Sequence, residues 1–112
     1  MAQAAPHIEP SPPIPAPGPA VIATAVDLLK ALASAARLTI VLELDRGERC
    51  VHELVEATGM TQPLVSQHLR VLRGAGVVRT RRRGREIAYS LTDQHLAHIA
   101  IDAVRHSEEL QR

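Results

Sequence analysis

Prolines crowd the start of the chain and limit how much of it can fold. Of the eight prolines in 112 residues, seven fall within residues 1–19. Proline lacks a backbone donor and fixes φ, so this stretch can form neither a regular helix nor a sheet ladder. We therefore expect residues 1–19 to be a disordered, proline-rich tail and residues 20–110 to form one small domain.

The core of this domain has to be aliphatic, because the chain has one Tyr and no Phe or Trp. A small domain buries a smaller fraction of its surface than a large one. A core this light is often completed by a second subunit, so the composition favours a homodimer.

Cysteine usage and hydropathy place the protein in the cell. Cys50 is the single cysteine, which excludes an intrachain disulfide and favours a reducing compartment. The N-terminus lacks the basic and apolar regions of a signal peptide. No apolar run approaches the roughly 20 residues that span a bilayer. We expect a soluble, cytoplasmic protein with no membrane partner.

Apolar periodicity and capping residues predict helices in the first half of the domain. Residues 21–33 fit a short amphipathic helix. A second helix follows, with Ser34 as its N-cap and Gly47 just beyond its end. Cys50 stands where a third helix begins, and Glu53 occupies the capping-box position three residues later.

A helix-turn-helix outline follows. The third helix stops near Thr58, since Gly59 is a good left-handed C-cap. Thr61 caps the next helix, which tolerates Pro63 in its first turn and runs to Gly74.

The pattern then changes to that of a β-hairpin followed by a last helix. Residues 77–80 and 87–91 read as strands, and residues 81–86, with Gly84 at the tip, supply the turn. The final helix covers residues 92–109. The predicted fold is mainly α with a β-hairpin: a winged helix-turn-helix, paired into a homodimer through its N- and C-terminal helices.

Positive charge is concentrated although the net charge is only +1. Seven of the thirteen basic residues lie between positions 70 and 85, with no acidic residue until Glu86. Such a patch is the footprint expected of a protein that binds a polyanion. A charge run can also be a solvated hairpin edge, but the preceding helix-turn-helix favours double-stranded DNA.

The second helix of a helix-turn-helix enters the major groove with its N-terminal side chains against base edges. The arginine-rich hairpin would lie beside it against phosphates or in a minor groove. The predicted DNA-binding residues are Thr61, Gln62, Ser66, Gln67, Arg70, Arg81, Arg82, Arg83 and Arg85. His68 lies on the inner stripe of the helix, and we expect it to be packed rather than to read bases.

Four segments together resemble the ArsR/SmtB family of bacterial repressors. They are residues 32–41 (LASAARLTIV), 50–54 (CVHEL), 65–72 (VSQHLRVL) and 76–78 (GVV). The resemblance covers roughly residues 20–110 in both order and spacing. It implies a dimeric winged helix that represses its operator until an inducer binds, and that is bound to the bacterial nucleoid while on DNA.

The last helix carries ligand types that suit zinc. Asp93 and His95 lie near its start, and His106 and Glu109 near its end. The two histidines are about 16 Å apart along a helix axis, whereas each nitrogen must lie about 2 Å from a shared zinc. One helix cannot hold the ion. The helix packed antiparallel against its twofold mate would form two equivalent sites from both chains.

The family resemblance extends to this set. Asp-x-His and His-x-x-Glu resemble the inter-subunit site on the C-terminal helix of SmtB-type zinc sensors. The predicted regulatory metal is therefore Zn²⁺, bound by Asp93, His95, His106 and Glu109. His98 and Asp102 fall outside the pattern.

A second metal site is a weaker prediction. The family's other site starts from a cysteine at the position of Cys50, and Glu53 supplies the acidic residue three positions on. The N-terminal arm would add further ligands, but here it offers only His7. His52 has no independent support. A helix N-terminus lowers a thiol pKa, which favours a ligand or reactive thiol; the alternative is that Cys50 is only a small residue at a helix cap.

The sequence thus predicts a metal-responsive repressor whose apo dimer binds an inverted-repeat operator and loses DNA affinity when zinc binds. The alternative is a metal-independent or structurally metallated regulator with another inducer, such as nickel or cobalt, or a thiol-reactive agent at Cys50. An enzyme is disfavoured, because four protein ligands close a tetrahedral zinc site and no nucleophile set or phosphate-binding loop occurs. No small-molecule substrate is expected.

Overall fold

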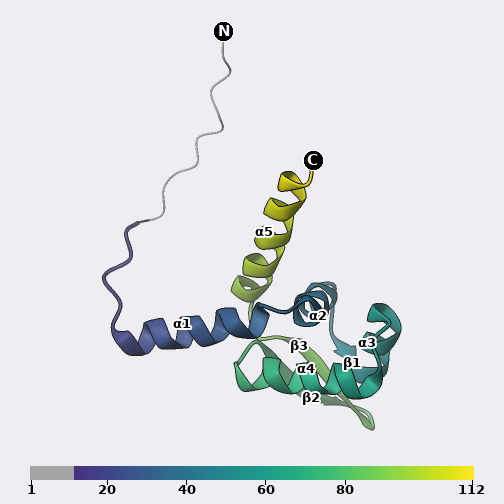
Figure 1. The fold of residues 1–112 in the computed structure, drawn as a ribbon. Coiled ribbons are helices and arrows are strands. Elements are labelled where there is room, and N and C mark those ends of the chain that lie inside the picture. Colours follow the sequence, from purple (N-terminus) through teal and green to yellow (C-terminus); the bar gives the residue numbers. More distant parts are fainter. Residues whose placement is uncertain (1–11) are drawn as a thin grey trace.

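The computed structural model describes residues 12–112, and Figure 1 shows its helices and strands. In chain order the elements are α1 Pro19–Leu32, α2 Ala35–Asp45, β1 Arg49–Cys50, α3 Val51–Thr58, α4 Gln62–Gly74, β2 Val78–Arg83, β3 Glu86–Leu91 and α5 Gln94–Leu110. The prediction of a mainly helical domain with a β-hairpin is confirmed. Of the predicted tail, residues 1–11 lie outside the described part, and residues 12–18 form no helix or strand.

Local chemistry sets where the first helices begin. α1 starts at Pro19, which the sequence analysis had placed in the tail. Proline is tolerated there because the first N–H groups of a helix have no intrahelical partner. The predicted N-cap of α2 is confirmed, since Ser34 Oγ accepts a hydrogen bond from the backbone N–H of Arg37 at 3.3 Å.

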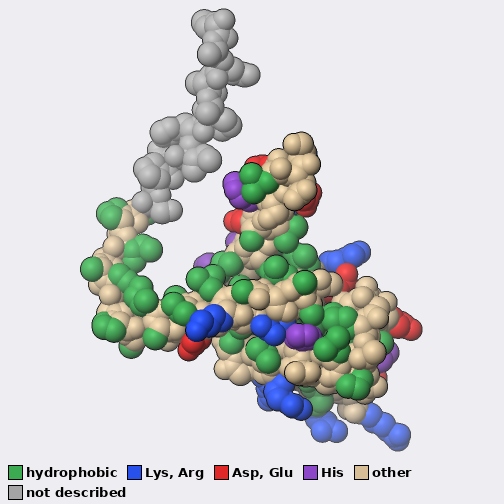
Figure 2. Space-filling view, viewed as in Figure 1, with side chains coloured by type: hydrophobic (Ala, Val, Ile, Leu, Met, Phe, Trp, Pro, Cys, Tyr) green, Lys and Arg blue, Asp and Glu red, His purple; other side chains and the backbone are tan. Residues whose placement is uncertain are grey.

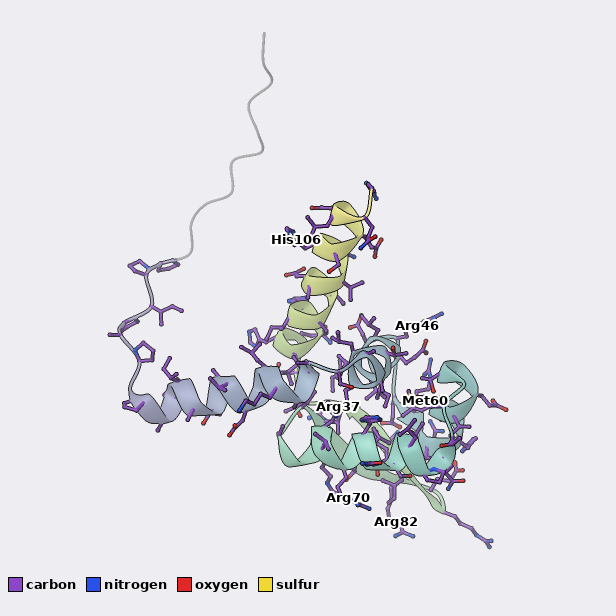
Figure 3. The ribbon with its side chains drawn as sticks, viewed as in Figure 1. Arg37, Arg46, Met60, Arg70, Arg82 and His106 are labelled. Carbon is purple, nitrogen blue, oxygen red and sulfur yellow. The ribbon has the colours of Figure 1, made fainter. Side chains whose placement is uncertain are left out.

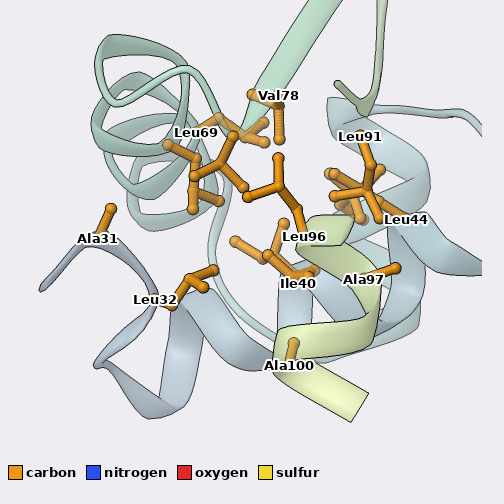
Figure 4. Packing of buried hydrophobic residues seen from close by; sticks show 14 of the residues in the cluster. Ala31, Leu32, Ile40, Leu44, Leu69, Val78, Leu91, Leu96, Ala97 and Ala100 are labelled. Atoms are coloured by element: carbon orange, nitrogen blue, oxygen red, sulfur yellow. The ribbon is translucent and has the colours of Figure 1, made fainter. Parts of the chain in front are cut away.

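The core lies where α2, α4, α5 and the sheet meet, and Figure 4 shows its packing. Its buried members are all aliphatic: Ala31, Leu32, Ile40, Val41, Leu44, Leu54, Val65, Leu69, Leu72, Val77, Val78, Leu91, Leu96, Ala97 and Ala100. α5 contributes only residues from its first half. Its second half therefore projects away from the domain (Figure 1).

The sheet has three antiparallel strands in the order β1-β3-β2. The hairpin strands are longer than predicted, because the pairing continues through Arg83 and Glu86. Only Gly84 and Arg85 remain as the turn, and Gly84 takes the positive φ of 65° that a tight two-residue hairpin favours. The expected turn over residues 81–86 was therefore wrong. β1 was not predicted, since two residues carry no alternation pattern.

α1 lies at the edge of the domain, against α2 and α4. Its exposed surface is rich in apolar side chains, visible in Figure 2 on the helix running to the left. Among residues 12–112, no helix is long and apolar enough to cross a lipid bilayer.

Candidate nucleic-acid interface and metal-binding helix

The helix-turn-helix forms as the capping residues predict. α3 ends at Gly59, which has φ 75° and donates its N–H to the carbonyl of Val55 at 2.9 Å. Thr61 takes the N-cap position of α4, although its side chain makes no capping hydrogen bond. Buried Leu54 on α3 and Val65 on α4 belong to the common core, so the two helices pack as one unit.

The outer face of α4 carries the predicted base readers. Thr61, Gln62, Gln67 and Arg70 are exposed, and Ser66 is half-buried. The inner face of the helix is buried in the core. Figure 3 shows Arg70 pointing away from the domain. The structure therefore presents these side chains on a convex helix surface, as insertion into a major groove requires.

His68 lies on the inner side of the same helix, as expected of a packed histidine. Its ring is half-buried, and Nδ1 is 3.2 Å from Nη1 of Arg37 on α2. Sequence reasoning gave no role to Arg37, because nothing in the local charge or apolar pattern marks it.

The β2–β3 hairpin, which we call the wing, carries four arginines predicted to bind DNA. Two of them form ion pairs within the chain. Arg81 Nε lies 2.6 Å from Glu48 Oε2. Arg83 donates from Nη2 to Oε1 of Glu53, and its Nη1 is 3.9 Å from Glu48 Oε1. Glu48 was not singled out from the sequence, since it is far from both arginines along the chain.

The other two wing arginines are placed differently. Arg82 near the end of β2 and Arg85 in the turn are exposed and form no ion pair with any residue in 12–112. In Figure 3 Arg82 projects on the same side as Arg70, and Figure 2 shows basic side chains gathered along that edge. α4, the second helix of the helix-turn-helix and its recognition helix, and the hairpin together form one basic surface.

Cys50, the suggested ligand of a second metal site, is buried beside a cavity of about 320 Å³ that it lines together with His52 and Glu86. It is 1% exposed and forms the N-cap of α3. Burial and a side-chain hydrogen bond with Glu86 raise the pKa of its thiol. The expectation that the helix N-terminus would lower this pKa was wrong, because the N-cap thiol is desolvated and lies among carboxylates. A protonated, buried thiol is a poor nucleophile and a poor metal ligand.

Glu53, the suggested partner of Cys50, is occupied by other contacts. Its Oε1 accepts the backbone N–H of Cys50 at 2.8 Å, which forms the predicted Glu half of the capping box. That hydrogen bond and the one from Arg83 lower the pKa of the Glu53 carboxyl. His52 Nδ1 lies 2.9 Å from Oε1 of Glu86, the carboxyl group that also forms the side-chain hydrogen bond with Cys50. His7 lies outside the described residues.

The two ligand pairs predicted on the last helix sit at opposite ends of α5. Asp93 is the N-cap, and its Oδ1 accepts the N–H of Leu96 and lies 3.6 Å from Nδ1 of His95. His106 and Glu109 are exposed in the last turns, and Figure 3 shows His106 far from the domain body. Within residues 12–112 of one chain, no three His, Cys, Asp or Glu side chains are grouped closely enough to hold a metal.

Apolar surface lies between these pairs and along α1. A groove of about 200 Å³ is lined by residues from α1, α2 and α5: Leu29, Leu32, Ala33, Leu38, Ile99, Ala100 and Ala103. Ile99 is 39% exposed, and Val26 and Leu29 on α1 are more exposed still. An apolar surface of this kind on two helices is typical of a protein interface.

Known proteins share both this sequence and this fold. Residues 34–80 match the bacterial regulatory protein, arsR family. The HTH-type transcriptional repressor SmtB of Mycobacterium tuberculosis is 56% identical over 99 residues, which make up 88% of this chain and 73% of that protein.

Two solved structures superpose on most of the chain. The solution structure of apo-NmtR has a TM-score of 0.66 and 40% identity, and covers 96% of this chain and 87% of its own. The homodimeric winged helix-turn-helix domain of Mb0332 from Mycobacterium bovis has a TM-score of 0.73 and 31% identity. The match covers 80% of this chain and 83% of the Mb0332 chain.

These similarities agree with the geometry described above. The fold is a winged helix-turn-helix with α4 as the recognition helix and β2 and β3 as the wing. The matched proteins are regulators rather than enzymes. The chain belongs to the ArsR/SmtB family of bacterial DNA-binding transcriptional regulators.

Proposed function

We propose that the protein is a homodimeric repressor that leaves its operator when zinc binds between its subunits. The observation that carries this proposal is the placement of Asp93 with His95, and of His106 with Glu109, at opposite ends of one exposed helix. Each end of the helix supplies half of the ligands for one metal site. The α5 helix of a second copy supplies the other half of each site.

DNA binding is assigned to the basic surface of α4 and the wing. Gln62, Gln67 and Arg70 are exposed side chains of the types that pair with adenine or guanine edges, with Thr61 and Ser66 beside them. The exposed wing arginines contact the phosphate backbone. A protein with this role works on the nucleoid in the bacterial cytoplasm.

Dimerisation is assigned to α1 and α5. Their exposed apolar residues and the groove between them are costly to leave in water, and a second copy of the same helices would cover them. The Mb0332 domain, which shares this fold, is homodimeric, and this supports a dimer of the present chain. Two protomers related by a twofold axis present two recognition helices to an inverted repeat.

The metal-ligand set fits zinc chemistry. Two imidazole nitrogens and two carboxylates supply four ligands of the kinds that zinc prefers in a closed tetrahedral site. Asp93 already has Oδ1 directed toward His95, so this pair is partly ordered by the helix cap. Zinc bound there would link the two α5 helices, and its affinity falls as the pH drops because the imidazoles must be neutral.

Metal and DNA then oppose each other through the dimer. α5 packs on α2 and β3, which in turn contact α3 and α4. A change in the α5–α5 angle therefore alters the separation of the recognition helices. By linkage, zinc lowers operator affinity by the same factor by which operator DNA lowers zinc affinity.

Fluorescence anisotropy with an operator fragment tests the proposal. We expect stoichiometric zinc to weaken binding by about 10-fold or more, equivalent to a coupling of roughly 1.4 kcal/mol. His106→Ala removes this response, whereas His98→Ala, an exposed histidine on the same helix, retains it. Operator affinity that is the same with and without zinc would contradict zinc sensing but not DNA binding. A loss of affinity with nickel or cobalt and not with zinc would show that the inducing metal is not zinc.

A further inference from the structure

The register of the hairpin divides its arginines between two faces of the sheet. Arg82 lies opposite Ile87, whereas Arg81 lies opposite Ala88 and Arg83 opposite Glu86. Successive side chains of a strand point to opposite faces, and directly paired residues share a face. Arg82 is therefore on one face, and Arg81 and Arg83 are on the other.

The face that carries Arg82 adjoins the recognition helix. Val78, which the same alternation along β2 places on this face, is buried in one core with Leu69 and Leu72 of α4. Figure 3 shows Arg82 and Arg70 directed to the same side of the molecule. A duplex that meets α4 therefore also meets Arg82.

The opposite face is occupied by carboxylates. Glu48 precedes β1, and its Oε2 lies 2.6 Å from Nε of Arg81. Glu53, in the first turn of α3, forms an ion pair with Arg83. Both carboxylates are more shielded than an ordinary surface pair, with side chains 23% and 33% exposed. The cluster contains two positive and two negative charges, so it contributes no net attraction for a phosphate backbone.

We propose that Glu48 and Glu53 set the discrimination between operator and other DNA by engaging Arg81 and Arg83. The wing then contacts phosphate through Arg82 and Arg85 only. This inference rests on the proposed DNA binding. Sequence-independent affinity grows with each phosphate that a free cation neutralises, whereas an arginine already held by a carboxylate adds little. The ion pairs thus restrain binding to competing sites without touching the base contacts of α4.

The salt dependence of binding to an unrelated duplex separates the two kinds of arginine. Arg82→Gln is expected to reduce the slope of log K against log salt concentration by about 1.8 per dimer, because each subunit loses one phosphate contact worth about 0.9. Arg81→Gln and Arg83→Gln are expected to leave that slope at the wild-type value. A reduction in Arg81→Gln as large as in Arg82→Gln overturns the inference.

Glu48→Gln tests the same point in the other direction. It frees Arg81, a long side chain that is 63% exposed, in each subunit, so the slope should rise by about 1.8 per dimer and the ratio of operator to unrelated-duplex affinity should fall severalfold. Glu53→Gln is a second variant that keeps a cap, since Gln also serves at that position. Glu56→Gln, exposed on α3, removes an equal charge and is the matched control.

The outcomes distinguish this inference from the proposed function. A wild-type protein without salt-dependent DNA binding contradicts DNA binding by the wing itself. Wild-type binding together with equal slopes for Glu48→Gln and Glu56→Gln contradicts only the role of the ion pairs.

Discussion

Nη1 of Arg37 lies 3.2 Å from Nδ1 of His68, which joins α2 to the inner side of the recognition helix. The same guanidinium donates from Nε to the carbonyl of Ala31 at 2.6 Å and from Nη2 to that of Lys30 at 3.4 Å. Arginine has no acceptor, so Nδ1 of the His68 ring is the acceptor in this contact. One side chain therefore connects the end of α1, α2 and α4.

Replacing this arginine should affect both stability and operator binding. Arg37→Gln leaves the carbonyls of α1 and the ring of His68 without their donor, at a cost of roughly 1–3 kcal/mol in the free energy of unfolding. Urea denaturation measures this cost, and anisotropy measures the accompanying loss of operator affinity. Arg46→Gln, at an arginine whose side chain is 73% exposed, is the control. Equal stabilities of the two variants would contradict the role given to Arg37.

The capping carboxylate should make stability depend on acid pH. The Cys50 N–H and Arg83 lower the pKa of Glu53 in the folded state, so the folded protein favours the carboxylate. Its contribution is complete above the ordinary Glu pKa of about 4.3 and is lost as the pH falls through the lower folded value. We expect the difference in Tm between wild type and Glu53→Gln to shrink below about pH 5. A difference that stays constant to pH 3 would refute this.

Cys50 should be inert in the native protein. Its thiol is buried and its pKa is raised, so both access and thiolate content are low. We expect a colourimetric thiol reagent at pH 8 to react slowly with the folded protein and at once in urea. Zinc should leave the native rate unchanged if Cys50 is not a ligand. Rapid native labelling, or protection by zinc, would restore the second metal site as a hypothesis.

Complementation between subunits tests the proposed zinc site. Homodimers of His95→Ala or of His106→Ala retain no complete site. In a mixed dimer of the two variants, one site loses both histidines and the other keeps all four ligands. Titration with zinc should therefore find no tight site in either variant alone and one in the mixed dimer. A mixed dimer that binds zinc no more tightly than either homodimer would exclude the inter-subunit arrangement.

The apolar face of α1 and α5 should govern the oligomeric state. Leu29→Glu or Ile99→Glu places a charge in the proposed interface, where burial without a partner is costly. We expect monomers in analytical ultracentrifugation and operator affinity at the level of an unrelated duplex. Leu110→Glu, exposed in the last turn of α5, is a control for added charge. Dimers that survive at both positions would place the interface elsewhere.

Helix boundaries could be predicted because caps are local chemistry. Ser34 and Gly59 act within three or four residues of their own positions, and the structure places them as the sequence indicated. The buried stripe of α4 could also be predicted, since helical periodicity fixes which side chains share a face. The ligand pairs on α5 come from residue types and from the family resemblance, and they stay a prediction.

Contacts between distant segments could not be predicted. Arg81 and Glu48 are 33 residues apart, and Arg37 and His68 are 31 apart, so no local pattern links them. β1 exists only because β3 passes beside it. The raised pKa of Cys50 depends on its burial and on Glu86, both of which arise from tertiary packing. The proposed zinc site needs a second chain, which a single sequence can suggest but not position.

The short strand β1 has a consequence for the operator. Because Arg49 and Cys50 pair with Tyr89 and Ala88, the first turn of α3 is fastened to the wing. α3 also packs on the recognition helix, which itself contacts β2, so recognition helix and wing are joined through packed contacts. An extra base pair between half-sites rotates the second one by about 35° around the duplex. A recognition helix that followed this rotation alone would have to break its contacts with α3 and β2, so we expect spacer length to constrain the operators that this repressor can occupy.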